Sequence, residues 1–193
     1  MERIIPHVTN ETARLRAVVL GLPDSLGPIP TLQETYDAKS YEAVSRGVFP
    51  SESDVRHEMQ CVLEVLERYG VRTLRPAPLT DYNQVFARDV AFTIDDTVFI
   101  SNLIPDRERE TEAFANSIFP LIAPAHIETL PETVHTEGGD VLLYDDILFV
   151  GAYFGADYSS FKTARTNRYA IDFFRERFPH KRIVPIELRK HDH

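Results

Sequence analysis

Residues 135–151 of the chain read HTEGGDVLLYDDILFVG, a polar turn with two glycines followed by two short apolar runs. Asp145 and Asp146 separate the runs, so this pattern predicts a loop, a strand, a tight turn and a second strand. Residues 89–101, DVAFTIDDTVFIS, repeat the order of an acid, an apolar run, an Asp-Asp turn and another apolar run. The leading acids, Asp89 and Asp140, lie 51 positions apart, and we expect one supersecondary unit to be used twice.

A helix and a further strand are expected after each of these hairpins. In the first copy, apolar residues at helical spacing end at Pro120, and residues 126–130 (HIETL) are expected to form the next strand. In the second copy, the pattern predicts a helix over about 163–178 and a strand at 182–186. The residues that this second helix should bury are Ala170, Phe173 and Phe174.

Residues before the first hairpin resemble a looser copy of the same module. Apolar runs at 15–20 and 71–74 predict strands, and the spacing between them predicts a helix that begins at Ser53 or Asp54 and ends at Gly70. A proline-rich excursion, with one short helix expected somewhere between about 33 and 46, separates the first strand from this helix.

The expected fold is therefore α/β, built of strand-strand-helix-strand modules. Their approximate bounds are 14–78, 86–131 and 137–188, in a single domain that spans residues 1–193. Modules of this kind cannot each bury a core alone, so we expect their strands to pack inward and their helices to lie outside.

Composition narrows the class of function. The chain has 193 residues, 43% of them hydrophobic, which allows one sizeable core. Its net charge of −9 argues against a nucleic acid or an anionic membrane as the main partner. The sequence has no signal pattern, no apolar run of membrane-spanning length and one cysteine, Cys61, so a cytoplasmic protein without an intrachain disulfide is expected. Cys61 lies beside the apolar stripe of its helix and is expected to be a packing residue.

Acidic residues at the starts of the modules are the first candidates for a site. Equivalent ends of related strands should meet near the axis of the assembly, which would bring Asp89, Glu137 and Asp140 within reach of one ligand. A guanidinium presents five N–H donors in a fixed fork, and carboxylates on more than one edge match it. From spacing alone, a plain structural role is favoured over this one, with the acids at strand ends and the glycines in a turn.

Two arginines are candidates for the opposite end of such a ligand. Arg165 precedes the helix of the last module and Arg107 the helix of the module before it, and either could hold a substrate carboxylate. A cation in a first helical turn opposes the helix dipole, which faintly favours a functional role.

Three motifs in this order and spacing resemble a known family. Residues 86–91 (FARDVA), 137–142 (EGGDVL) and 165–167 (RTN) are similar to those of the guanidine-modifying (pentein) superfamily, which includes arginine deiminases, dimethylarginine dimethylaminohydrolases and amidinotransferases. The resemblance implies an α/β-propeller of five ββαβ modules with pseudo-fivefold symmetry, of which about three are present here. The ligand would lie at its centre.

The resemblance also implies roles for single residues. Asp89 would hold the guanidinium of an arginine-like substrate, and Glu137 would face the same group while orienting a catalytic histidine. Arg107 and Arg165 would hold the substrate's carboxylate. A cysteine thiolate would attack the guanidinium carbon, and water or an acceptor amine would release the covalent intermediate. The resemblance implies no cofactor or metal.

The chain departs from the family pattern at its end. Neither the His-x-Asp motif nor the late nucleophilic cysteine is present, and the terminal residues 191–193 (HDH) are interpreted as the entry to a loop cut short before that motif. The leading hypothesis is a guanidino-modifying enzyme represented by its N-terminal part. The alternative is a non-catalytic domain that binds guanidino ligands or partner proteins. Exposed apolar edges of an open ring predict a homo-oligomer or aggregation.

Overall fold

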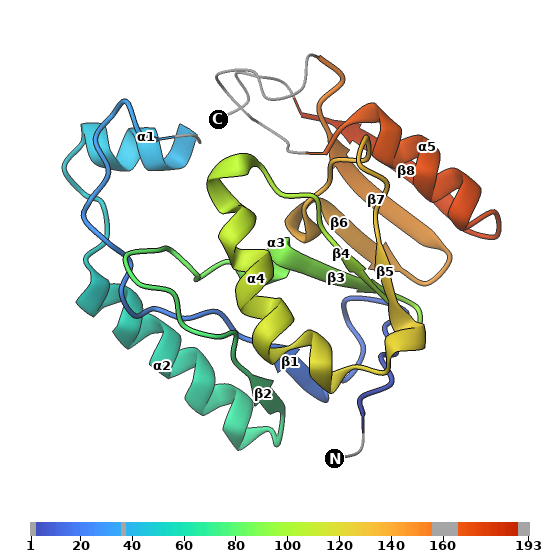
Figure 1. Cartoon of the computed structure of the whole chain (residues 1–193), viewed down its shortest axis with the longest axis horizontal. Coiled ribbons are helices and arrows are strands. Elements are labelled where there is room, and N and C mark those ends of the chain that lie inside the picture. The colour runs from blue at the N-terminus through green and yellow to red at the C-terminus, as the bar shows by residue number, and fades with distance from the viewer. Residues whose placement is uncertain (1–2, 36–37, 156–165, 189–193) are drawn as a thin grey trace.

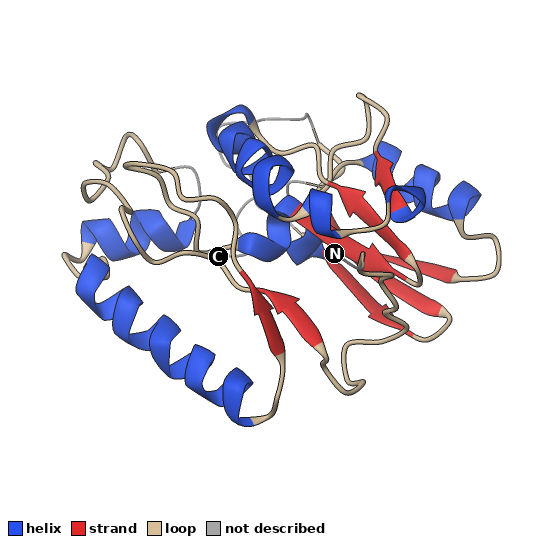
Figure 2. Ribbon diagram, turned by 60° about the horizontal axis from the view of Figure 1, so that its bottom comes forward, coloured by secondary structure: helices blue, strands red, loops and turns tan. Residues whose placement is uncertain are grey.

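Three small sheets make up the strand framework of the protein. The computed structural model describes residues 3–35, 38–155 and 166–188. Within these residues, β1 and β2 form a two-stranded sheet, while β3-β4-β5 and β6-β7-β8 form three-stranded sheets. Figure 2 shows the two-stranded sheet apart from the other two. In chain order the elements are β1 (Ala17–Val19), α1 (Ala38–Ser45), α2 (Glu52–Arg68), β2 (Arg72–Leu74), α3 (Ala87–Val90), β3 (Ala91–Ile94), β4 (Thr97–Ile100), η1 (Pro105–Arg107), α4 (Glu108–Ser117), η2 (Phe119–Leu121), η3 (Pro124–His126), β5 (Ile127–Thr129), η4 (Gly138–Asp140), β6 (Val141–Tyr144), β7 (Ile147–Ala152), α5 (Arg168–Arg177) and β8 (Arg182–Glu187).

The second and third modules have the same topology. In each, an antiparallel hairpin is followed by a helix and by a strand that pairs parallel with the second strand of the hairpin: β3-β4 then β5, and β6-β7 then β8. The hairpin turns have left-handed backbone at Asp95 (φ 54°) and Asp145 (φ 51°), a conformation that aspartate tolerates better than most residues. The predicted order of strand, strand, helix and strand is confirmed for both modules.

The helix of each of these modules packs against its own sheet and against the sheet before it. Phe174 on α5 contacts Phe92 and Phe99 of the preceding module, with ring centroids 6.1 and 6.4 Å apart. Likewise, the buried cluster around Phe114 on α4 has Val19 of β1 packed against it, and α4 lies at the centre of Figure 1. Neighbouring modules therefore share their apolar contacts, as expected for units that cannot close a core alone. Closure into a complete propeller is not shown by these residues.

The N-terminal module is the most open of the three. Among the described residues its strands pair only with each other, in a parallel sheet, and α2 has no buried residue. The prediction that Cys61 is a packing residue is wrong, because the face of α2 that carries it is not covered and the residue is exposed. The N-cap of α2 is Ser51 rather than Ser53 or Asp54, because Ser51 and Asp54 form a reciprocal capping box.

The other helices compare with the predictions as follows. Helix α1 (Ala38–Ser45) lies between residues 33 and 46, where one short helix was predicted. Helix α5 begins at Arg168 rather than near 163, and it buries Ile171 in place of Phe173, which is only partly buried. None of the helices in the described part of the chain is long and apolar enough to cross a membrane.

Candidate functional site

The starts of the second and third modules lie directly against each other. Helix α3 and the short helix η4 each precede a hairpin, and they contact one another. A side chain at Gly138 would collide with the main-chain oxygen of Arg88, so only glycine permits this close approach. The amide of Gly139 donates a hydrogen bond to Oδ1 of Asp89 across 3.1 Å. The FARD and EGGD motifs are therefore joined through main-chain contacts.

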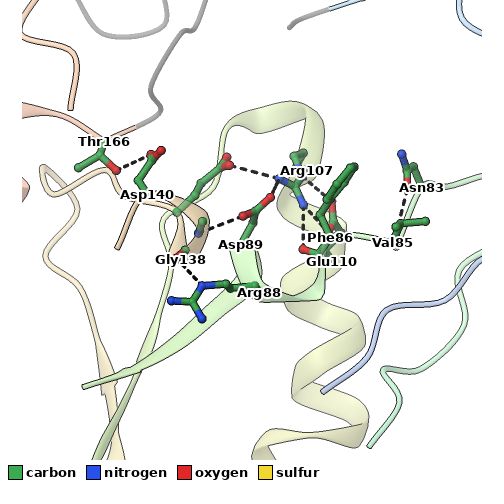
Figure 3. Close-up of polar contacts among 12 residues, drawn as sticks. Asn83, Val85, Phe86, Arg88, Asp89, Arg107, Glu110, Gly138, Asp140 and Thr166 are labelled. Atoms are coloured by element: carbon green, nitrogen blue, oxygen red, sulfur yellow. Dashed lines mark hydrogen bonds and ion pairs between the residues drawn. The ribbon is translucent and has the colours of Figure 1, made fainter. Parts of the chain in front are cut away.

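Arg107, where η1 joins α4, lies between the two acids that these motifs contribute. Its Nη1 donates to Oδ2 of Asp89 at 2.7 Å and to Oε2 of Glu137 at 3.2 Å (Figure 3). Its other edge pairs with Glu110, Nε to Oε1 at 2.7 Å and Nη2 to Oε2 at 2.8 Å. Nη2 also donates to the carbonyl of Phe86 at 3.3 Å. Acids from two modules thus converge on one flat cation, and that cation is a residue of the chain itself.

Burial makes this arrangement unusual among ion pairs. The side chains of Arg107, Glu110 and Glu137 are at most 5% exposed, and that of Asp89 is 16% exposed. Burial alone would lower the pKa of Arg107, but the hydrogen bond and charge of Glu110, the charge of Glu137 and the hydrogen bond of Asp89 outweigh it and raise that pKa. One guanidinium is held charged among three carboxylates.

Arg88 links the FARD motif to the main chain of the EGGD turn and of β6. Its Nε donates to the carbonyl of Gly138 at 2.9 Å and its Nη2 to the carbonyl of Val141 at 2.6 Å. The same guanidinium pairs with Glu11, Nη2 to Oε1 at 2.7 Å, in the N-terminal segment. These bonds tie the FARD motif to the EGGD turn, so the spacing between Asp89 and Glu137 depends on Arg88.

Asp140 and the RTN motif form a second network. Thr166 donates to Oδ2 of Asp140 at 2.7 Å, and Thr136 and Thr166 share a hydroxyl hydrogen bond of 3.0 Å. Asn167 is the N-cap of α5, where its side chain accepts from the amide of Ala170 at 3.1 Å. In the contacts described, these residues do not face Arg107. Arg165 and residues 191–193 lie outside the described residues.

The predicted site residues thus have different surroundings. Asp89 and Glu137 come together as the repeat suggested. Arg107 was expected to hold a substrate carboxylate, but its Nε, Nη1 and Nη2 donate to protein carboxylates, so the structure gives it a different set of partners from the expected one. Sequence reasoning did not single out Glu110. Its spacing three residues after Arg107 on the first helical turn is a signal that would have found it.

Two other features bear on what the site can do. Phe86, whose carbonyl contacts Arg107, exposes 60% of its surface next to the acids. Among the described residues, no group of three or more histidines, cysteines, aspartates or glutamates is placed to hold a metal ion. The chemistry that these side chains suit is recognition of a planar cation.

The chain was compared with family models, curated proteins and solved structures. No family model matches the chain. The uncharacterized protein YkgA of Bacillus subtilis is 31% identical over 107 residues, which are 55% of this chain and 33% of that protein. SxtG, an amidinotransferase of saxitoxin biosynthesis from Microseira wollei, matches with a TM-score of 0.61 and 15% identity, over 94% of this chain and 62% of its own.

A second solved structure agrees. The dimethylarginine dimethylaminohydrolase of Pseudomonas aeruginosa, solved as a cysteine-to-serine mutant with citrulline, matches with a TM-score of 0.63 and 14% identity, over 91% of this chain and 62% of its own. The chain spans a third of the curated relative and about three fifths of each structure. At these identities the structural likeness concerns the fold alone. Over some nine tenths of its length the chain has the same fold as about three fifths of these two guanidine-modifying enzymes, which agrees with the resemblance of its motifs.

Proposed function

We propose that this protein binds the guanidino group of arginine, or of a related guanidino or ureido compound, between Asp89 and Glu137. The observation that carries the proposal is the convergence of these two acids, from successive modules, on the guanidinium of Arg107. A pair of carboxylates that accepts one guanidinium has the spacing and orientation that another guanidinium needs.

The energetics favour a cationic ligand at this position. At an effective dielectric constant near 20, one close charge pair contributes on the order of 4 kcal/mol before desolvation is subtracted. Both acids are largely withdrawn from water, with side-chain exposures of 16% and 2%, so their charges are weakly screened. Arg107 offsets only part of the negative charge, because three carboxylates contact it.

The reaction that we propose for the whole protein follows the chemistry that the resemblance implies. A cysteine thiolate attacks the guanidino carbon, an amine leaves, and a covalent amidino-thioether remains. Water releases this intermediate in a deiminase or hydrolase, and an acceptor amine releases it in an amidinotransferase. Asp89 holds the guanidinium, while Glu137 faces the same group and orients the histidine that moves protons. The scheme requires no metal or cofactor.

A second candidate function is guanidino binding without turnover. One observation favours it for this chain: the only cysteine of the sequence, Cys61, is exposed on α2, where its described contact is with His57, 4.0 Å away. It is not among the groups that contact the acids. Catalysis would need a thiol from residues other than those described at the site.

Calorimetry tests the binding proposal. The protein is titrated with arginine, methylated arginines, agmatine and citrulline, alongside Asp89→Asn and the exposed control Asp172→Asn. We expect at least one of these compounds to bind, and Asp89→Asn to weaken binding by about tenfold or more, equivalent to 1.4 kcal/mol. Asp172 pairs only with the exposed Arg175 among the described contacts, so its variant should match the wild type. Equal affinities for all three proteins would refute the assignment.

Intact-mass spectrometry separates the two functions. If the whole protein is an enzyme, incubation with its substrate and rapid acid quenching should reveal a covalent amidino adduct on a cysteine. Release of ammonia, an alkylamine or a transferred amidine should accompany it. Binding by calorimetry without adduct or product supports the non-catalytic function instead.

A further inference from the structure

Arg107 is a buried cation at the N-terminus of a helix, where a positive charge is unfavourable. It is the N-cap of α4, and its side chain makes no capping hydrogen bond there. A cation at a helix N-terminus opposes the helix dipole, so the helix itself does not hold it in place. The residue is nevertheless 4% exposed. Its four charged contacts to Asp89, Glu110 and Glu137 are therefore what retain it.

Both carboxylate oxygens of Asp89 already accept a hydrogen bond, and Arg107 supplies one of the two donors. Oδ1 accepts from the amide of Gly139 at 3.1 Å, and Oδ2 accepts from Nη1 of Arg107 at 2.7 Å. The same Nη1 donates to Oε2 of Glu137. An external guanidino group that bridges Oδ2 of Asp89 and Oε2 of Glu137 in the same way competes with that one nitrogen.

We propose that Arg107 is an internal guanidinium ligand, which fills the guanidino position at Asp89 and Glu137 until an external guanidino compound exchanges for it. The inference rests on the proposed function, in that the same two acids bind the external group. It differs from the expectation that Arg107 grips the ligand's carboxylate. Here the ligand's guanidinium and Arg107 are competitors.

Glu110 makes the exchange feasible. It accepts hydrogen bonds from Nε and Nη2 of Arg107, whereas Asp89 and Glu137 accept from Nη1. When Nη1 leaves Asp89 and Glu137, Arg107 keeps this two-bond ion pair and does not become an unpaired buried charge. The incoming guanidinium restores the contacts that Nη1 gave up, so every charged group still has a partner.

An external guanidinium can bind in this position only to protein molecules in which Nη1 of Arg107 has left Asp89 and Glu137. The apparent dissociation constant is the intrinsic one divided by the fraction of such molecules. Minor conformations of this kind are commonly populated at about 0.1–10%. Removing Arg107 should therefore tighten the binding of a small guanidinium by about tenfold or more. A ligand without a carboxylate gives the clearest test, because its affinity cannot depend on an ion pair between Arg107 and a ligand carboxylate.

The test compares methylguanidinium binding to the wild-type protein, Arg107→Met and the exposed control Arg175→Met, by calorimetry in the whole protein. We expect about tenfold or tighter binding to Arg107→Met only, and loss of this gain in Arg107→Met/Asp89→Asn. Equal binding to wild type and Arg107→Met would overturn the exchange. Weaker binding to Arg107→Met would also overturn it, because Arg107 would then assist the ligand.

Two further measurements keep the inference testable if Arg107→Met folds poorly. Millimolar guanidinium chloride should raise the melting temperature of Arg107→Ala with saturation, whereas the same concentration of sodium chloride should not; no saturable rise would contradict the exchange. In the wild-type protein, saturating methylguanidinium should shift the nitrogen resonances of the Arg107 guanidinium, and unchanged resonances under saturation would contradict it. Rescue of Arg107→Ala and exchange by methylguanidinium in the wild type, combined with no binding of arginine, methylated arginines, agmatine or citrulline, would support the internal ligand and refute the proposed function.

Discussion

Replacement of Gly138 by alanine should separate the two motifs that bring Asp89 and Glu137 together. The added methyl group would meet the main-chain oxygen of Arg88 and would lie 2.9 Å from Cβ of Phe92, which is closer than carbon atoms approach. Neither neighbour is the flexible end of a side chain. The EGGD turn must therefore move away from α3 by on the order of 1 Å.

A movement of that size breaks the contacts that define the site. Glu137 lies 3.2 Å from Nη1 of Arg107, and Gly139 lies 3.1 Å from Asp89, so both hydrogen bonds are near the outer limit already. Overpacking typically costs about 1–3 kcal/mol, and each weakened hydrogen bond from Arg88 to the turn adds to it. We expect Gly138→Ala to lower the free energy of unfolding by about 3 kcal/mol or more.

Urea denaturation and calorimetry provide the readouts, with Gly139→Ala as a matched control. For urea slopes of about 1–3 kcal/mol per molar, the midpoint of Gly138→Ala should fall by about 1–3 M. A methyl group at Gly139 meets only the carboxylate of Asp89, which can rotate away, so its unfolding should change by less than about 1 kcal/mol. Guanidino binding should fall in both variants. A Gly138→Ala protein that unfolds at the wild-type midpoint would refute the role of close approach.

Three other perturbations probe the framework around the site. The side chain of Lys181 is 5% exposed and donates to Asp95 at 2.8 Å and to the carbonyl of Asp145 in the next hairpin turn, so Lys181→Met should cost about 1–3 kcal/mol in urea denaturation; an unchanged midpoint would show that the two turns do not need this link. Asn167→Ala removes the N-cap of α5 and should cost about 1–2 kcal/mol, seen as a lower melting temperature; no change would rule out the cap as a source of stability. The side-chain hydrogen bond from Ser51, with its backbone hydrogen bond second, lowers the pKa of Asp54. Its contribution to α2 is therefore present above the unfolded-state pKa and is lost as pH falls through the folded-state pKa. Amide protection at the start of α2 should drop on acidification in the wild type and stay flat in Asp54→Asn; equal profiles would contradict this.

Local features of the fold could be predicted because they depend on neighbouring residues. The two hairpins follow from apolar runs flanking Asp-Asp turns, where aspartate tolerates left-handed backbone. The end of α2 follows from Gly70, which adopts a φ of 68° just beyond the helix. The start of α2 was misplaced by a few residues, because several polar residues in the run 51–54 could cap it and only the reciprocal pairing of Ser51 with Asp54 decides between them.

Burial in the first module could not be predicted, because it depends on what lies against the helix. The apolar stripe of α2 is only half covered: Val55, Met59, Leu63 and Leu66 are partly buried, whereas Val62 is 46% exposed. Cys61, next to Val62, is exposed as well. Periodicity states which residues would pack if a partner surface were present, and it carries no information on whether the surface is there.

The amino-acid sequence by itself determined the modules, their hairpin turns and the acids that open them, because turn chemistry and apolar periodicity operate within about ten residues. Only the tertiary structure decided that the cation facing Asp89 and Glu137 is Arg107, and that Glu110 holds its other edge. The physical reason is that an ion pair depends on the distance between side chains. That distance is set by the close approach of α3 and η4 at Gly138, across 50 residues of chain.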